Sequence, residues 1–475
     1  MIKKLCRISF LLLMIALFTL TGCSTSVVPM RVPEDQAMQT PTTENNPFPE
    51  KLASLPSADF GAKAFRIATN SNTLIIPSGN TSIFDKALYQ RNRAVEDKYN
   101  IRLTLTEESG LPTITSRIQR EALAGSDYCD LILLDTAQFQ VLVNSASLLN
   151  LRSIPYFDSL SDGYDQNSIN ATTRGSVTYG VCGELTLEPS NFYALFFNKD
   201  LLSKTELPNL YSLVRDNHWD FENFLVCAEE LHSLGRVNGN RVYGFGSTES
   251  TENLVKMLWA ASGGRYIDNT YGYVPQMDFD NDNTQAFITN SKKILFRSSS
   301  YLSNADTSKN AFVQGNLGFL AAPISIISDI LESNINWGIL PLPKADVNQE
   351  HYYSYTERDY IVAGIAKGTT DPTMSGMVTN ALFHASNGNM IDLHVQHYLN
   401  FYFECQEDGE MLLQLLKTPY YETVEFFGQG DPSHPYTACT QTLLYRVIST
   451  NADFKSLYNQ NKKMFDKYIE QNNIK

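Results

Sequence analysis

The sequence has few basic residues, few cysteines and no long apolar run after its first 22 residues. It contains 37 Lys and Arg against 51 Asp and Glu, which gives a formal net charge of −14. A surface with this excess of acid repels phosphate, so the composition argues against nucleic-acid binding, which needs a basic footprint. No segment after Cys23 approaches the roughly 18 uninterrupted apolar residues of a transmembrane helix. We therefore expect everything beyond Cys23 to be soluble.

The seven cysteines have no spacing that indicates a disulfide framework or a zinc site, because CxxC pairs are absent. Setting aside Cys6 and Cys23 leaves an odd number of candidates: Cys129, Cys182, Cys227, Cys405 and Cys439. We expect most of them to be buried as small apolar residues. A bridge between Cys405 and Cys439 stays open as an alternative in an exported protein.

Motifs of nucleophilic, metal-dependent and phosphate-binding enzymes are also missing. GxSxG, HExxH, SxxK with KTG, and GxxxxGK are not found intact. Glu229 and Glu230 are adjacent on a predicted helix, face different sides and cannot flank one glycosidic bond. The sequence therefore gives no reason to expect an enzyme, although a surface hydrolase is kept as an alternative.

Two short motifs superficially suggest a metal site. In the stretch DFDNDN, Asp278, Asp280 and Asp282 have the first spacings of a calcium loop, but its glycine and bidentate glutamate are missing. His394 and His397 share one side of a helical turn without a third ligand nearby. We predict a helix-capping loop for the first motif and a surface or packing role for the second. Neither a metal nor a cofactor is expected.

The N-terminus has the features of a secretory leader. Three basic residues precede the eleven-residue apolar run FLLLMIALFTL, which is too short to span about 30 Å of hydrocarbon. The run leads into Leu20-Thr21-Gly22-Cys23, which resembles the lipobox of bacterial lipoproteins. The resemblance implies removal of residues 1–22 and a lipidated Cys23, held at the membrane by several acyl chains. Removal leaves 34 Lys and Arg against 51 Asp and Glu, a net charge of −17.

After the leader, the chain divides by composition and by periodicity. Residues 23–61 are rich in Pro, Thr, Glu and Asn and lack periodic apolar residues, so we expect a lipidated flexible tether. Strand and helix patterns then alternate from residue 64 to residue 136, which predicts a parallel α/β unit. Parallel sheets of this kind bind ligands at the carboxyl ends of their strands. Asn70, Asp135 and Thr136 follow two such strands and are candidate ligand contacts.

A second series of alternating elements follows from residue 193. It includes a helix beginning near Asp220, a strand ending near Ser247 and a strand stopping at Pro323. NWGILPLPKAD reads as a connection between units, because prolines are excluded from central strands. From about Met390 to the end, the chain is predicted to be mostly helical and polar.

The order of these segments resembles the family 1 extracellular solute-binding proteins, the lipoprotein receptors of ABC importers, in their Gram-positive form. Six elements carry the resemblance: GSVTYG at Gly175, YALFFNKDLL at Tyr193, HWDFENF at His218, VYGFG at Val242, FVQGNLGFL at Phe312 and WGILPLP at Trp337. The correspondence runs from about residue 65 to the mid-380s. It implies an α/β, two-lobed periplasmic-binding-protein-like fold of type II, with hinge crossovers and a helical C-terminal part.

On that pattern, lobe 1 comprises 62–183 plus 344–385, and lobe 2 comprises 192–336 plus 386–475, with crossovers near 183–192 and 337–343. A small solute is expected between the lobes, which close because the ligand contacts both only in the closed state. Candidate ligand contacts follow from position at strand ends and near the hinge: Asn70, Asp135, Thr136, Asn191, Ser247, Glu249, Trp337, Tyr355, Glu357 and Arg358. Trp219 and Trp259 are predicted to lie in the core.

The resemblance predicts a membrane-anchored receptor on the extracellular side that delivers a small polar solute to ABC permease subunits. An oligosaccharide is the favoured solute. Aromatic faces stack on sugar rings and 25 Tyr are available, so the composition is compatible with a sugar without identifying one. A monomer is expected. A peptide or other polar solute is the alternative ligand, and a surface lipoprotein hydrolase or a signalling receptor is the alternative function.

Overall fold

The computed structural model describes residues 46–71, 74–77, 82–106, 111–356, 360–428, 431–472 and 474. Apart from Asn46, these residues belong to one folded unit, Pro47–Lys475. The predicted leader and Cys23 lie outside the described residues, and so do Glu357 and Arg358.

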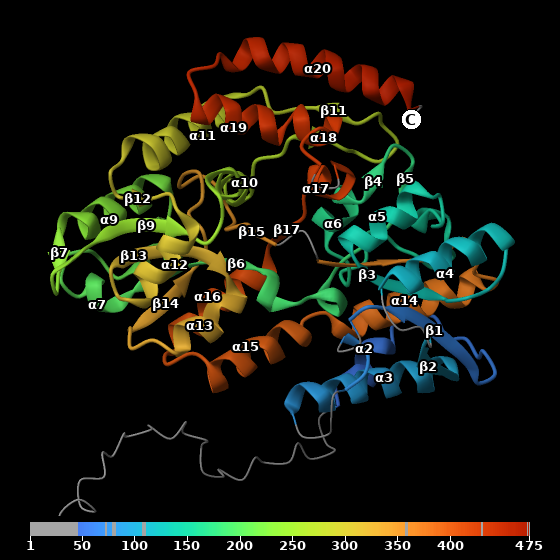
Figure 1. The fold of residues 1–475 in the computed structure, drawn as a ribbon. Helices are drawn as coiled ribbons and strands as arrows, with labels where there is room; N and C mark the ends of the chain where they lie inside the picture. The colour runs from blue at the N-terminus through green and yellow to red at the C-terminus, as the bar shows by residue number, and fades with distance from the viewer. Residues whose placement is uncertain are drawn as a thin grey trace, which may run out of the picture. The chain divides into compact units, whose positions relative to one another are not determined.

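The first sheet has four strands in the order β16-β3-β1-β2. β1 (Lys63–Thr69), β2 (Ile101–Leu105) and β3 (Leu131–Asp135) are parallel, as the alternating pattern predicted. β16 (Ile361–Gly364) joins the edge antiparallel to β3, with Ile361 opposite Asp135. The carboxyl ends of β1 and β3 therefore lie at one edge of the sheet, beside the start of β16 (Figure 1).

Helices cover both faces of this sheet: α3 (Ile83–Tyr99), α4 (Leu111–Ala124), α5 (Thr136–Asn144) and α14 (Pro372–Ser386). The side chains of β3 alternate between two cores. Leu131 and Leu133 pack with Leu382 of α14, whereas Ile132 and Leu134 pack with Phe139 of α5. This alternation on a fully buried strand explains why β3 reads as a continuous apolar run.

A short helix precedes the first strand. α2 (Phe48–Leu52) packs against α3 and α14, and its two apolar residues are only 2% exposed. Downstream, the Phe60 amide donates to the Tyr99 carbonyl at 3.0 Å. The prediction of a tether over 23–61 is therefore wrong for residues 47–61, because Phe48 and Leu52, four residues apart, share one helical face that packs into the core.

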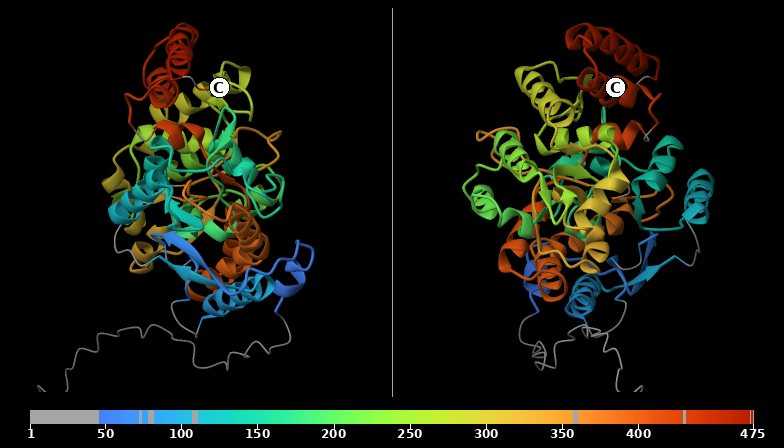
Figure 2. Two further views of the ribbon diagram at one scale, coloured as in Figure 1. Left: turned by 90° about the vertical axis from the view of Figure 1, so that its right-hand side faces the viewer. Right: turned by 60° about the vertical axis from the view of Figure 1, so that its left-hand side comes forward.

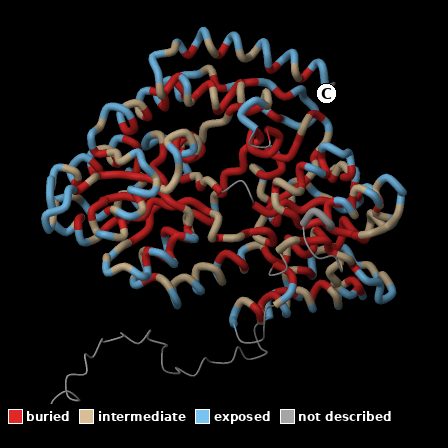
Figure 3. Tube along the Cα trace, in the orientation of Figure 1, coloured by how far each residue is buried: buried red, intermediate tan, exposed pale blue. Residues whose placement is uncertain are grey.

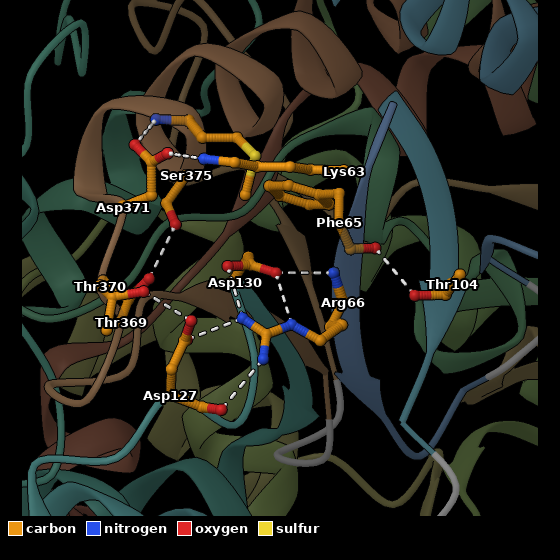
Figure 4. A network of polar contacts seen from close by, with 11 residues as sticks. Lys63, Phe65, Arg66, Thr104, Asp127, Asp130, Thr369, Thr370, Asp371 and Ser375 are labelled. Atoms are coloured by element: carbon orange, nitrogen blue, oxygen red, sulfur yellow. Dashed lines mark hydrogen bonds and ion pairs between the residues drawn. The ribbon is translucent and has the colours of Figure 1, made fainter. Parts of the chain in front are cut away.

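The opposite end of the first sheet is held by a buried acid (Figure 4). Asp130, at the start of β3, accepts from the backbone amide of Arg66 at 2.8 Å and from its Nε at 3.0 Å. The guanidinium also bonds Asp127 at 2.7 Å, and Asp127 in turn accepts from Thr370 at 2.6 Å. This network ties the start of β3 to the middle of β1, away from the carboxyl ends of both strands.

The second sheet has five strands in the order β12-β9-β13-β6-β14. The strands are β6 (Tyr193–Asn198), β9 (Tyr243–Ser247), β12 (Tyr301–Leu302), β13 (Leu317–Pro323) and β14 (Trp337–Leu340). β9 runs parallel to β13, and β6 runs antiparallel to both β13 and β14. Residues 337–340 were expected to be a connection, but they form an edge strand, because Pro341 and Pro343 come after it rather than within it.

Four longer helices flank the second sheet: α9 (Phe221–Ser233), α10 (Thr251–Ala261), α11 (Asp282–Lys292) and α12 (Ala305–Val313). The Asp220 carboxylate caps α9 by accepting from the Asn223 amide at 2.9 Å. Trp219 is completely buried and Trp259 is 3% exposed, so both tryptophans predicted to be in the core are there. The indole of Trp219 donates to the Pro341 carbonyl at 2.9 Å.

The chain passes between the two sheets twice, over residues 183–192 and 341–360, and residues 365–390 then lead from β16 through α14 into the C-terminal helices. The C-terminal part is helical as predicted: α15 (Met390–Phe401), α16 (Gln406–Lys417), α17 (Thr423–Gly428), α18 (Pro435–Ala438), α19 (Gln441–Ser449) and α20 (Phe454–Gln471). It is less polar than expected, because α16 and α19 bury leucines. In Figure 3, buried segments lie at the centre of the molecule and exposed segments at its outside. α20 packs on α18 and α19 at the outside (Figure 2).

The remaining elements are short: η2 (Leu151–Ser153), α6 (Gln166–Ala171), β4 (Thr173–Arg174), β5 (Val177–Thr178), η3 (Glu184–Thr186), η4 (Pro189–Asn191), α7 (Lys199–Leu202), α8 (Leu210–Arg215), β7 (Arg236–Val237), β8 (Asn240–Arg241), β10 (Ile267–Asp268), β11 (Gln276–Met277), η5 (Lys293–Arg297), η6 (Ile324–Ile326), α13 (Ile327–Leu331), β15 (Ser354–Tyr355) and β17 (Pro419–Tyr420). All five cysteines in the described residues are free thiols, so Cys405 and Cys439 are not bridged.

Candidate functional site

The first group of candidate residues lies at the carboxyl edge of the first sheet. The Asn70 amide donates to the Asp135 carboxylate at 2.7 Å. Asn70 directly follows β1, and Asp135 is the last residue of the neighbouring strand β3. The other carboxylate oxygen of Asp135 caps α5 through the Gln138 amide at 2.8 Å. Thr136 is 1% exposed, and its backbone amide donates to the Tyr360 carbonyl at 3.0 Å.

This group continues into the first crossing segment. The Ser71 hydroxyl donates to Oε1 of Glu188 at 2.6 Å, and the Asn191 amide lies 3.5 Å from Oε2 of the same carboxylate. Glu188 and Asn191 belong to the segment 183–192 that leads from the first sheet to the second. Glu188 was not among the predicted residues, yet it connects Asn191 to the end of β1.

The second group lies at the edge of the second sheet where β9 ends and β6 begins. The Tyr193 hydroxyl donates to Oε1 of Glu249 at 3.0 Å, and Asn253 donates to Oε2 at 3.0 Å. Ser247 is 1% exposed and donates to the Ala321 carbonyl at 3.1 Å, so its hydroxyl supports the strand end. Glu249 is half-buried, and its carboxylate is a hydrogen-bond acceptor at this edge of the sheet.

Tyr355 brings the two groups together. Its ring lies 5.6 Å from the ring of Tyr193, and the next residue, Thr356, forms a β-bridge with Phe192. Phe192 stands between Asn191 of the first group and Tyr193 of the second. A path of hydrogen bonds, ring contacts and adjacent residues therefore runs from Asp135 to Glu249 through the crossing segments.

The C-terminal part adds residues that sequence reasoning missed. β17 pairs with β15, which places Tyr420 opposite Tyr355, and the Tyr420 hydroxyl donates to Glu422 at 2.6 Å. Burial raises the pKa of Glu422 to about 7. Glu425 accepts from Gln441 at 2.7 Å, and its backbone carbonyl accepts from Gln140 of α5 at 3.0 Å.

These acids affect the phenol of Tyr355. Burial raises its pKa, and the carboxylates of Glu425 and Glu249 raise it further, so the hydroxyl stays a hydrogen-bond donor at neutral pH. The sequence offered one signal for this wall of the site: two tyrosines and two glutamates in the stretch YYETVE, 420–425.

Trp337 does not lie with the other candidates. It pairs with Asn198 at the far end of β6 from Tyr193, and it packs against Phe196 and Phe403 with ring centroids 5.7 and 6.0 Å away. β14 runs antiparallel to β6, which places its first residue at the opposite edge of the sheet from Ser247 and Tyr193.

The two motifs that resembled metal sites have structural partners. Asn281 caps α11 by accepting from Thr284 at 3.0 Å, and Asp280 pairs with Lys455. His394 packs against Phe84 at 4.7 Å, and burial lowers its pKa to about 3. Within the described ranges, no three His, Cys, Asp or Glu side chains are grouped as metal ligands would be. None of the helices in those ranges is long and apolar enough to span a membrane.

A cavity of about 600 Å³ lies away from the strand edges, between α9, α10 and α11. Its lining includes Phe221, Glu229, Trp259, Arg265 and Asn290, and it contains none of the candidate residues. The candidate site therefore lies where strand ends of the two sheets come together, and this cavity is separate from it.

The sequence matches the family model of the bacterial extracellular solute-binding proteins over residues 91–378, which is more than half of the chain. The chain belongs to this family. The solute-binding protein thus comes from a family of binding proteins rather than enzymes, and such proteins serve ABC transporters. No curated protein matches its sequence.

Two solved structures are similar to this chain at low sequence identity. A family 1 extracellular solute-binding protein from Bifidobacterium longum subsp. infantis is 13% identical, with a TM-score of 0.52 over 86% of this chain and 100% of that one. An ABC substrate-binding protein from Listeria monocytogenes, in complex with cycloalternan, is 14% identical, with a TM-score of 0.45 over 87% and 100%. The mixed α/β architecture of the solute-binding protein, with its two sheets, agrees with a two-lobed periplasmic-binding-protein-like fold.

Proposed function

We propose that this protein binds a small hydroxyl-rich solute, an oligosaccharide, between its two sheets and delivers it to an ABC permease. The observation that carries the proposal is the continuous polar path from Asp135 through Glu188 and Asn191 to Tyr193 and Glu249. The path joins the strand edges of both sheets across a crossing segment. A solute bound along it would contact both halves of the fold at once.

The chemistry along this path suits hydroxyl groups and sugar rings. The carboxylates of Asp135, Glu188 and Glu249 are half-buried and accept hydrogen bonds from neutral amide and hydroxyl donors, so each has lone pairs for solute hydroxyls. The rings of Tyr193 and Tyr355 supply aromatic surface beside these acceptors, and aromatic faces stack on the CH faces of sugars. A few directed polar groups beside aromatic surface are typical of small-molecule sites.

In this proposal, lobe 1 consists of 62–183 plus 344–385 and lobe 2 of 192–336 plus 386–475. The solute stabilises the closed arrangement, because it contacts both lobes only there. We further propose that residues 1–22 are removed, that lipid on Cys23 anchors the protein at the outer side of the cell membrane, and that the anchored protein acts as a monomer.

A ligand screen tests the solute class. The purified protein is heated with maltotriose, cellotriose and mannotriose, and separately with tripeptides, and unfolding is followed by fluorescence. A ligand at 100 times its dissociation constant should stabilise the folded state by about 2.7 kcal/mol. If only the tripeptides stabilise the protein, the proposed solute is a peptide rather than an oligosaccharide.

Two further measurements separate a receptor from the alternatives. Small-angle scattering should show a more compact particle with the bound trisaccharide, and the trisaccharide should be recovered unchanged after long incubation. Cleavage products would favour a surface hydrolase. Binding without compaction would contradict lobe closure and favour another kind of receptor.

Site variants test the proposed contacts. Glu249→Gln should weaken trisaccharide binding by about 1 to 3 kcal/mol, because the amide replaces one acceptor oxygen by a donor and a hydrogen bond from a solute hydroxyl is lost. Glu252→Gln, one turn along α10, is the matched control and should bind as the wild type does. Equal affinity of both variants would remove Glu249 from the site.

A further inference from the structure

We infer that residues 265–273, here called the clasp, hold the two lobes together in the closed state and thereby set how tightly and how long the solute is bound. The inference rests on the proposed function, because it concerns the same closure. It assigns a positioning role to residues that lie outside the polar path from Asp135 to Glu249.

The base of the clasp belongs to lobe 2. The ring of Tyr266 stacks on Trp259 of α10 with centroids 5.0 Å apart, and Ile267 of β10 pairs with Met277 of β11. Tyr266 is 1% exposed and Trp259 is 3% exposed. The clasp is therefore anchored in the helical layer beside the second sheet and moves with it.

Its partner surface belongs to lobe 1. The residues around 150–182 are tied to the first sheet, because Val181 forms a β-bridge with Ala363 of β16. Asn150 donates to the Ser176 carbonyl at 2.9 Å, and Arg152 donates to the Thr178 hydroxyl at 3.1 Å, which fixes the β4–β5 hairpin beside η2.

Four residues of the clasp cross to this surface, and the contacts lie along its whole length. Arg265 donates to Asn167 at 2.5 Å, and the Gly272 amide donates to the Gly175 carbonyl at 3.0 Å. Asn269, which is 6% exposed, donates to two backbone carbonyls, that of Asn170 at 2.8 Å and that of Thr173. The guanidinium of Arg152 lies 4.0 Å from the centroid of the Tyr271 ring.

Separation of the lobes must break these contacts, since each joins a residue of one lobe to a residue of the other. None of them involves a residue of the polar path, so the clasp adds stability to the closed state without touching the solute. When only a fraction of molecules is binding-competent, the apparent dissociation constant rises in inverse proportion to that fraction. Weakening the clasp should therefore lower affinity by shifting this population, mainly through faster release.

Tyr271 and Tyr273 offer a matched comparison. Tyr271 is 39% exposed and stacks under Arg152, whereas Tyr273 is 70% exposed, two residues further along the same loop. Tyr271→Ala should weaken binding of the tightest trisaccharide about two- to fivefold, the size of one exposed cation–π contact. Tyr273→Ala should have no effect. Tyr271→Phe, which keeps the ring under the guanidinium, should restore wild-type affinity and release rate.

Scattering and hydrogen exchange provide readouts other than affinity. Scattering of ligand-free Tyr271→Ala should give a radius of gyration equal to or larger than that of Tyr273→Ala, and adding trisaccharide should still compact it. Hydrogen exchange at the Gly272 amide should be slow in the trisaccharide complex of the wild type and faster in that of Tyr271→Ala.

The outcomes separate the two claims. If no trisaccharide binds or compacts the wild type, the proposed function fails. If the wild type closes on the sugar but Tyr271→Ala and Tyr273→Ala bind equally, the clasp is overturned while the receptor function stands. Fast exchange at the Gly272 amide in the wild-type complex would also overturn the clasp.

Discussion

Glu422 gives the protein a pH-dependent stability whose sign follows from its burial. The side chain is 6% exposed, and burial raises its pKa to about 7 from an ordinary value of 4.5, although the Tyr420 hydroxyl and Arg265 partly oppose this rise. Because the folded-state pKa exceeds the unfolded value, the folded protein binds more protons between the two. Its contribution to stability is therefore present below about pH 4.5 and is lost as the pH rises through about 7.

The magnitude follows from the size of the shift. One pKa unit corresponds to about 1.36 kcal/mol, so Glu422 should lower the free energy of unfolding by roughly 2 to 3 kcal/mol between pH 5 and pH 8. Glu422→Gln resembles the protonated acid in shape, can still accept from Tyr420 and does not titrate. The difference in unfolding free energy between this variant and the wild type should therefore grow with pH.

Urea unfolding at pH 5, 6, 7 and 8 measures this difference directly, since other titrating groups are common to both proteins and cancel. Glu230→Gln, on the exposed face of α9, is the control and should run parallel to the wild type. A constant offset between Glu422→Gln and the wild type at all four pH values would refute the reasoning, because it would show that Glu422 has the same pKa folded and unfolded.

Three further predictions concern the fold and the anchor. Asp220→Ala should lower the free energy of unfolding by about 1 kcal/mol through loss of the α9 cap, as measured by urea unfolding against the control Asp216→Ala. Gly244→Ala should destabilise the second sheet by about 1 to 3 kcal/mol or more, because the new Cβ would lie 1.9 Å from the Ala228 carbonyl; an unchanged melting temperature would contradict this packing. Cys23→Ala should leave a precursor that is uncleaved or unanchored in membrane fractionation, whereas normal lipid labelling of the variant would end the lipoprotein proposal.

Local sequence patterns were sufficient to predict the parallel part of the first sheet, because its strands are close together in the sequence. The strand predicted at 64–70 is observed at Lys63–Thr69, and the apolar run before Asp135 is the central strand β3. Parallel strands joined by helices also bring their carboxyl ends to one edge. For this reason Asn70 and Asp135 could be placed together from the sequence, and they are hydrogen-bonded.

Long-range pairing was the part that local patterns could not supply. β16 has four residues and no distinctive periodicity, and its place beside β3 depends on a partner far away in the chain. Glu188 and Glu425 were missed for the same reason, because their partners Ser71 and Gln140 come from distant segments. Trp337 was expected near the site because it borders a crossing segment, but the antiparallel direction of β14 decides which edge it occupies.

The pairing of β16 with β3 also determines the order in which the protein can be completed. Val362 lies beside Leu134, and the strands β6, β9, β12, β13 and β14 of the second sheet are all encoded between them. During synthesis, the first sheet therefore lacks its edge strand until every strand of the second sheet has been made. Such non-local pairing slows folding, because loop closure must come before the contacts that reward it.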